Sequence, residues 1–285
     1  MASSFADHIS SSLTKLGQTA KTLVKLLLSA RSVCFDKTMK NTSLYILGNG
    51  PSLRDNLNRD FQLLQQADTL AVNFAANSPE FTSLRPKYYV LADPHFFVNA
   101  SDANVSKLIA SLRNVDWKMT LYVPATAKVP QQLAQSTFLT IKRFNFVAAE
   151  GFEWFENWTF AHNLGMPRPR NVLIPSIMIG MWMNYKQIYL LGADHSWSKT
   201  LSVDNENHVV TIQPHFYKEE KQELKRINIT YQNIPLHAVF ESFSIAFRAY
   251  HRLQRYAIKK NINIINATPE SFIDAFPRGT IQTQK

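Results

Sequence analysis

The stretch Leu44-Tyr-Ile-Leu-Gly-Asn-Gly-Pro-Ser-Leu53 decides the fold. Its first four residues, Leu44–Leu47, are apolar and predict a short buried strand. Gly48 and Gly50 then predict a sharp turn into a helix, with a backbone that comes close to a ligand. Backbone N–H groups at such a turn, together with the positive end of the helix dipole, suit a phosphate. The stretch therefore predicts a nucleotide-type ligand at the carboxyl end of a first parallel strand.

The turn differs from two well-known phosphate-binding loops. Pro51 suits the first position of the following helix, where its missing N–H costs no hydrogen bond. The glycine spacing matches neither the G-x-G-x-x-G motif of dinucleotide-binding folds nor the G-x-x-x-x-G-K-[ST] motif of P-loops. The pattern therefore favours neither of these two ligand classes.

Strand and helix patterns alternate from residue 43 onward, and residues 43–285 are predicted to form one transferase domain. Short apolar runs predict strands at Leu44–Leu47, Thr69–Asn73, Tyr88–Ala92, Met119–Val123, Leu139–Lys142, Gln187–Leu191 and Ile262–Ile265. Helices are predicted at Ser52–Gln66, Ala103–Arg113, Ala125–Ala134, Val172–Asn184 and His237–Lys260. This alternation predicts an α/β fold with a doubly wound, mostly parallel, Rossmann-like sheet. Two segments are predicted to be irregular: the aromatic-rich Phe144–Pro169 and a lid-like segment at 196–236.

The composition indicates a globular protein with an anionic partner. Of the 285 residues 45% are hydrophobic and 18% charged, and the formal net charge is +10. This charge suits a nucleotide, an acidic sugar or an anionic membrane, whereas the absence of an arginine-rich tail and of a nucleic-acid motif argues against nucleic acid. A single cysteine, Cys34, excludes an internal disulfide and favours a cytoplasmic location. No run of 18 apolar residues predicts a membrane span.

Residues 1–42 are predicted to form an amphipathic helical extension. Apolar residues recur there at helical spacing, at Ile9, Leu13, Leu16, Ala20, Leu23 and Leu27, and basic residues stand between and after them at Lys15, Lys21, Lys25 and Arg31. Two interpretations are open. The helix packs on the domain or on a neighbouring subunit of a homo-oligomer, or residues 8–31 lie on the inner face of the cytoplasmic membrane as a peripheral contact.

Polar residues stand where several predicted strands end. Asn49 follows the first strand, Asn73 ends the second and Asp93 follows the third. Because the carboxyl ends of parallel strands meet at one edge of a sheet, we expect a shared ligand site, although Asn and Asp also make turns and caps. The predicted binding residues are Gly48, Asn49, Gly50, Pro51, Ser52, Asn73, Phe74, Asp93, Asn171, Pro175, Ser176, Asp194 and His195.

Two Asp–His pairs raise the question of a metal site. Asp93 precedes His95 by two residues, and Asp194 directly precedes His195. Both residue types ligate transition metals. Neither pair shows an H-x-x-x-H or a cysteine spacing, and no Asp-x-Asp triplet of the kind that holds a metal-bound nucleotide occurs. We therefore expect neither a metal nor another cofactor to be required.

His237 is the predicted general base. It follows Pro235 and Leu236 and opens a long helix. The positive end of the helix dipole disfavours a cationic imidazole, which suits a neutral base near pH 7. The alternative is a histidine that only caps or packs.

The same motifs resemble those of a known enzyme family. Gly48–Leu53, Asn73 and Asn184-Tyr-Lys-Gln-Ile-Tyr-Leu-Leu-Gly-Ala-Asp194 resemble, in order, segments of the bacterial lipooligosaccharide sialyltransferases of glycosyltransferase family 42. His237 stands where that family has its catalytic histidine. The resemblance implies a variant GT-A fold without a required metal, and a CMP-sialic acid donor bound by Gly48–Ser52 and Asn73. It further implies a surface-glycan acceptor, as in lipooligosaccharide or capsule, and an inverting displacement with His237 as base.

Two departures from this family stand close to the predicted site. Asn171-Val172-Leu173 replaces a Thr-Ser-Gly segment, and the paired tyrosines that hold the leaving phosphate are replaced by His195 and Trp197. His195 is the candidate for that phosphate-binding role. The exact donor sugar, including another CMP-linked acidic sugar, therefore stays open.

Two other functions remain open. Gly48–Leu53 and Pro86–Asp93 also resemble the archaeal-type hydroxymethylpterin diphosphokinases and related flagellin-modification accessory proteins, in which Asp93 and Asp194 would hold Mg²⁺. A non-catalytic nucleotide-binding module is the third interpretation. Activity that survives EDTA would favour glycosyl transfer over the kinase.

Overall fold

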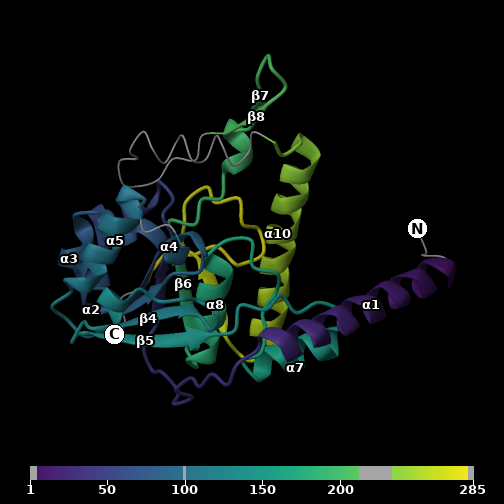
Figure 1. The fold of residues 1–285 in the computed structure, drawn as a ribbon, viewed down its shortest axis with the longest axis horizontal. Helices are drawn as coiled ribbons and strands as arrows, with labels where there is room; N and C mark the ends of the chain where they lie inside the picture. Colours follow the sequence, from purple (N-terminus) through teal and green to yellow (C-terminus); the bar gives the residue numbers. More distant parts are fainter. Residues whose placement is uncertain (1–4, 99–100, 212–232, 282–285) are drawn as a thin grey trace.

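A computed structural model describes residues 5–98, 101–211 and 233–281 of the chain. Seven parallel strands form one sheet with the order β5-β4-β3-β2-β1-β6-β9 (Figure 1). They are β1 (Leu44–Leu47), β2 (Asp68–Val72), β3 (Tyr88–Val90), β4 (Met119–Pro124), β5 (Leu139–Phe144), β6 (Gln187–Leu191) and β9 (Asn263–Asn266). The fold is the predicted doubly wound α/β architecture. The strand order reverses between β1 and β6, which is where such sheets open a crevice for ligands.

Helices cover both faces of this sheet (Figure 1). They are α2 (Leu53–Gln66), α3 (Glu80–Leu84), α4 (His95–Val98), α5 (Ala103–Arg113), α6 (Gln131–Ala134), α7 (Glu153–Ala161), α8 (Leu173–Trp182) and α10 (Leu236–Lys259). Alternate residues of β1 point to opposite faces, so Leu44 and Ile46 pack with α8 and α10 whereas Tyr45 and Leu47 pack with α2. All four residues of β1 are therefore buried, which explains its uninterrupted apolar sequence.

Shorter elements lie at the edges of the fold. The 3₁₀ helix η1 spans Asn73–Asn77, and a second, η2, spans Trp197–Thr200. A small antiparallel pair is formed by β7 (Ser202–Val203) and β8 (Val209–Val210). The elements η2, β7 and β8 belong to the segment predicted as a lid at 196–236. Residues 212–232 of that segment lie outside the described residues.

Three local predictions are wrong. The helix predicted at Ala125–Ala134 is reduced to α6, because Pro130 pushes the residue before it out of the helical region. The segment predicted to be irregular contains α7, whose buried Phe155 and Phe160 were not recognised as a helical pattern. Helix α2 begins at Leu53, so Pro51 lies in the preceding turn and not at the first helical position.

The amino-terminal helix α1 (Phe5–Ser29) packs against the domain through a few residues of its carboxyl-terminal half. Thr19, Thr22 and Leu26 are buried there, and Leu26 contacts Phe155 of α7. The amino-terminal half of α1 extends beyond the rest of the molecule (Figure 1). Within the described ranges, no helix combines the length and the apolar character needed to cross a bilayer.

Candidate active site

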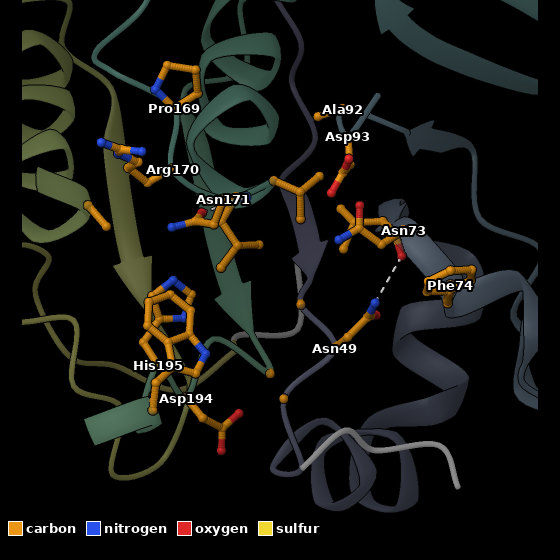
Figure 2. Close-up of a pocket in the computed structure, with 18 of the residues that line it drawn as sticks. Asn49, Asn73, Phe74, Ala92, Asp93, Pro169, Arg170, Asn171, Asp194 and His195 are labelled. Atoms are coloured by element: carbon orange, nitrogen blue, oxygen red, sulfur yellow. Dashed lines mark hydrogen bonds between the residues drawn. The ribbon is translucent and has the colours of Figure 1, made fainter. Parts of the chain in front are cut away.

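A cavity of about 670 Å³ lies beyond the carboxyl ends of β1, β2, β3 and β6. Figure 2 shows two walls, one with Asn73, Phe74 and Asp93 and the other with Arg170, Asn171 and His195. Ten of the predicted residues line it: Gly48, Asn49, Gly50, Pro51, Asn73, Phe74, Asp93, Asn171, Asp194 and His195. The fold thus brings together residues that are far apart in the sequence.

Four predicted residues do not line the described cavity: Ser52, Pro175, Ser176 and His237. Ser176 is buried, and its hydroxyl donates to the carbonyl of Val172 one helical turn earlier. His237 lies at the exposed start of α10, whereas the cavity is lined by that helix from Ser242 onward. Five residues of helix span about 7.5 Å. His237 therefore does not line the described cavity, and its role as the general base stays a prediction.

The turn after β1 is fastened to the turn after β6 by backbone hydrogen bonds. The N–H of Gly48 donates to the carbonyl of Leu191 at 2.7 Å, and the N–H of Gly50 donates to that of Gly192 at 2.9 Å. A Cβ atom on Gly48 would lie 2.4 Å from the carbonyl oxygen of Gly192. Glycine is therefore required here so that two backbone segments can approach each other, and its role differs from the predicted approach to a ligand.

The carboxylate of Asp194 lies at the amino-terminal end of α2. It accepts hydrogen bonds from the backbone N–H of Ser52 at 3.3 Å and from its hydroxyl at 2.8 Å. Burial raises the pKa of Asp194, and the two bonds from Ser52 oppose that shift. With Gly48 and Gly50 also paired, three N–H groups of this turn are occupied within the protein. Phosphate binding at the turn stays a prediction, and the turn lines the cavity.

Two asparagines of the cavity wall carry buried polar atoms that the described residues leave without a partner. One is Oδ1 of Asn73, a residue at the end of β2 with a left-handed backbone at φ 50°. The other is Nδ2 of Asn171, whose Oδ1 accepts from the N–H of Leu173 at 3.0 Å and from the hydroxyl of Tyr250 at 2.9 Å. Buried polar atoms are almost always hydrogen-bonded, so these two atoms point to a polar ligand.

His195 is held in one tautomer by a chain of hydrogen bonds. Its Nε2 lies 2.6 Å from the hydroxyl oxygen of Tyr250. Since that hydroxyl gives its only proton to Oδ1 of Asn171, it must accept the proton of Nε2. The neutral imidazole therefore carries its lone pair on Nδ1. Trp197 stacks on the ring with centroids 4.1 Å apart, and burial lowers the pKa of His195 to about 3.

This pKa makes stability depend on pH. The unfolded chain binds the imidazole proton below its ordinary pKa of 6.5, whereas the folded protein binds it only near pH 3. The neutral, buried His195 therefore contributes to the free energy of unfolding above pH 6.5, and this contribution is lost as the pH falls. Between pH 7 and pH 5 we expect a loss of about 2 kcal/mol in the free energy of unfolding, which His195→Asn would abolish. Urea unfolding of both proteins at the two pH values measures it, and parallel losses would contradict the assignment.

Cationic side chains stand at the rim of the cavity. Arg170 and Lys199 both line it and are exposed, and the ammonium of Lys199 lies 5.2 Å from the centre of the Phe272 ring. On the opposite wall, Asp93 accepts the backbone N–H of His95 at 2.8 Å. The part of the chain that the structure describes brings no three His, Cys, Asp or Glu side chains together as metal ligands. The rim therefore offers positive charge to an anion.

Tyr250 is a residue of this site that was not predicted from the sequence. Tyr250 is in the middle of α10 among buried aromatic side chains, and no spacing in the sequence marks its hydroxyl as part of a site. Arg170, which also lines the cavity, was likewise not among the predicted site residues. Their roles become visible only when α10 and the loop before α8 meet beside β6.

Comparison with known proteins adds a structural likeness. No family model matches the chain, and no curated protein matches it. Among solved structures, the MAf glycosyltransferase from Magnetospirillum magneticum AMB-1 superposes with a TM-score of 0.51 at 13% sequence identity. The alignment covers 92% of this chain and 37% of that structure. At this identity the likeness concerns the fold, and the chain spans little more than a third of that protein.

Proposed function

We propose that this protein transfers a sugar from a nucleotide-linked donor, bound in the cavity, to the hydroxyl of a glycan acceptor. The observation that carries the proposal is the cavity itself. It lies at the carboxyl ends of the strands beside the switch point and contains two unpartnered amide atoms, Asn73 Oδ1 and Asn171 Nδ2. Its volume of about 670 Å³ is within the range of small-molecule sites. The structural likeness to a glycosyltransferase supports the same reaction class.

The donor we favour is a CMP-linked acidic sugar such as CMP-sialic acid. Its phosphate and carboxylate are both negative and match Arg170 and Lys199 at the rim. Cytosine carries an exocyclic amine that donates hydrogen bonds, whereas uracil has a carbonyl at the same position. Oδ1 of Asn73 is an acceptor, so it would favour cytosine over uracil. The resemblance of Gly48–Leu53 and residues 184–194 to the sialyltransferases supports this donor class.

His195 is our candidate for the general base in place of His237. In the proposed step the acceptor oxygen attacks the anomeric carbon, Nδ1 of His195 takes the hydroxyl proton, and the bond to the phosphate breaks with its electron pair leaving on CMP. A pKa near 3 is too low for a good base in the empty cavity. A bound dianionic donor stabilises the imidazolium and so raises the pKa. Arg170 and Lys199 would stabilise the leaving phosphate.

Nucleotide binding can be tested by thermal unfolding with CMP, UMP, GDP and ATP, each with and without Mg²⁺. A ligand at 100 times its dissociation constant adds about 2.7 kcal/mol, which raises Tm by several degrees. We expect CMP to give the largest shift and to need no metal. Asn73→Gly keeps a residue that tolerates the left-handed backbone but removes the acceptor oxygen, so it should lose most of the shift.

Asn261→Gly is the matched control for this experiment. Asn261 also has a left-handed backbone, at φ 52°, and is exposed outside the cavity. Its variant should keep the full CMP shift. A shift with ATP and Mg²⁺ alone would reject glycosyl transfer in favour of the diphosphokinase. Equal shifts with CMP and UMP would reject the role of Asn73 in reading the base.

A further inference from the structure

Helix α1 carries an apolar stripe that the described part of the chain does not cover. Its side chains are between 45% and 85% exposed, and they recur at the three- and four-residue spacing of one helix face. The stripe consists of Ile9, Leu13, Leu16, Leu23, Val24 and Leu27. Together these side chains form one contiguous row along the length of the helix, unlike scattered surface apolar residues, so they call for a partner.

The orientation of the stripe is fixed, because α1 is attached to the domain along a different face. The hydroxyl of Thr22 donates to the carbonyl of Glu150 at 2.9 Å and accepts its N–H at 3.1 Å. The hydroxyl of Thr19 accepts the N–H of Phe152 at 3.2 Å. Gly151, at φ 139°, leaves room for Thr19, since a Cβ there would lie 2.1 Å from its hydroxyl oxygen. The leucines of the stripe are thereby held away from the domain.

The charges of α1 argue against a second copy of this helix as the partner. The helix contains three basic residues, Lys15, Lys21 and Lys25, and a single acidic residue, Asp7, at its start. Pairing two such helices would bring lysines together without the acidic partners that stabilise helix pairs. An anionic surface satisfies both the apolar stripe and the lysines.

Exposed aromatic and basic side chains also lie near α1. Helix α7 lies beside the carboxyl-terminal half of α1 (Figure 1) and exposes Trp154 and Trp158, by 69% and 45%. Tryptophan is enriched where proteins meet the headgroup region of a bilayer. Lys25 and Arg170 line a groove of about 440 Å³ between α1 and the domain, which adds positive charge near the helix.

We infer that α1 binds in the plane of an anionic lipid bilayer, with its apolar stripe inserted at the headgroup boundary. The helix lies along the surface and does not span it. The lysines contact anionic headgroups, and the tryptophans of α7 add to the contact. This inference does not depend on the proposed glycosyl transfer.

The test is flotation of the full chain with vesicles of phosphatidylcholine alone or mixed with phosphatidylglycerol. We expect binding to the mixed vesicles that weakens with added salt. The double variant Leu16→Glu/Leu23→Glu should lower the partition coefficient by at least about tenfold. Met39→Glu is the control, because Met39 is 60% exposed outside α1 and should leave binding unchanged.

Thermal unfolding with and without CMP separates this inference from the proposed function. All variants should unfold at the wild-type temperature and keep the wild-type response to CMP, because the altered side chains lie outside the cavity. Equal binding of the double variant and wild type would overturn the inference. Absence of vesicle binding would also overturn it, as would a lipid-independent dimer that the double variant converts to a monomer.

Discussion

Gly48→Ala is expected to lower the free energy of unfolding by about 3 kcal/mol or more. The added Cβ would lie 2.4 Å from the carbonyl oxygen of Gly192 and 2.9 Å from its carbonyl carbon. Both are backbone atoms, so no side-chain rotation relieves the contact. The hydrogen bond from Gly48 to Leu191 and the parallel pairing of β1 with β6 resist a backbone shift. Urea unfolding followed by circular dichroism measures the loss.

Gly17→Ala is the matched control for Gly48→Ala. Gly17 is in α1, and a Cβ there meets no atom within 4 Å. Alanine is the better helix former by about 1 kcal/mol, so this variant should be neutral or slightly more stable. If Gly48→Ala unfolds at the same urea concentration as wild type, the two turns do not need the glycine for their close approach.

The fold could be predicted from the sequence because the inner strands of this sheet are buried on both faces. Runs such as Leu44–Leu47 and Gln187–Leu191 therefore stand out, and a parallel sheet with helical connections follows from their alternation. A helix with a local break was harder to predict. In the segment that leads to α6, Pro130 overrides the helical pattern before it. The sequence thus predicts elements well where a single local signal decides them.

The chemistry of the turn after β1 could not be read from local sequence. Gly48 and Gly50 form a pattern typical of ligand binding, yet their N–H groups are satisfied by Leu191 and Gly192, about 140 residues later in the chain. Asp194 likewise provides a negative charge at the helix start from the far side of the switch point. A pattern of glycines predicts that another group comes close to the backbone, but it does not show whether that group is a ligand or a second backbone segment.

Several residues predicted from their place after a strand line the described cavity. Asn73 directly follows β2 and Asp93 lies three residues beyond β3, and the end of a parallel strand leads to the edge where the cavity lies. His237 was predicted from its place at a helix start and from the family resemblance, whereas Ser242 of the same helix lines the described cavity. Tyr250 was missed, because its hydroxyl matters only through contacts with residues on two other elements.

His195→Asn is expected to lower kcat by about 10²-fold or more, while CMP still raises the unfolding temperature. Asparagine tolerates the left-handed backbone of this position, at φ 52°, but has no basic nitrogen. The release of CMP from a CMP-linked acidic sugar, measured with short glycan acceptors, gives kcat. Tyr250→Phe should have a smaller effect and shift the pH profile, because it removes the group that holds the tautomer but leaves Nδ1 in place.

His237→Ala decides between the two histidines. His237 is exposed at the start of α10 and is absent from the described cavity lining, so its loss should change kcat by no more than about twofold. If His237→Ala abolishes turnover and His195→Asn does not, the base belongs to His237, and the buried histidine only holds the wall of the cavity. If both variants turn over normally, neither imidazole accepts the proton. The low pKa of His195 in the empty protein makes this comparison informative, because only a bound anion makes it basic enough to act.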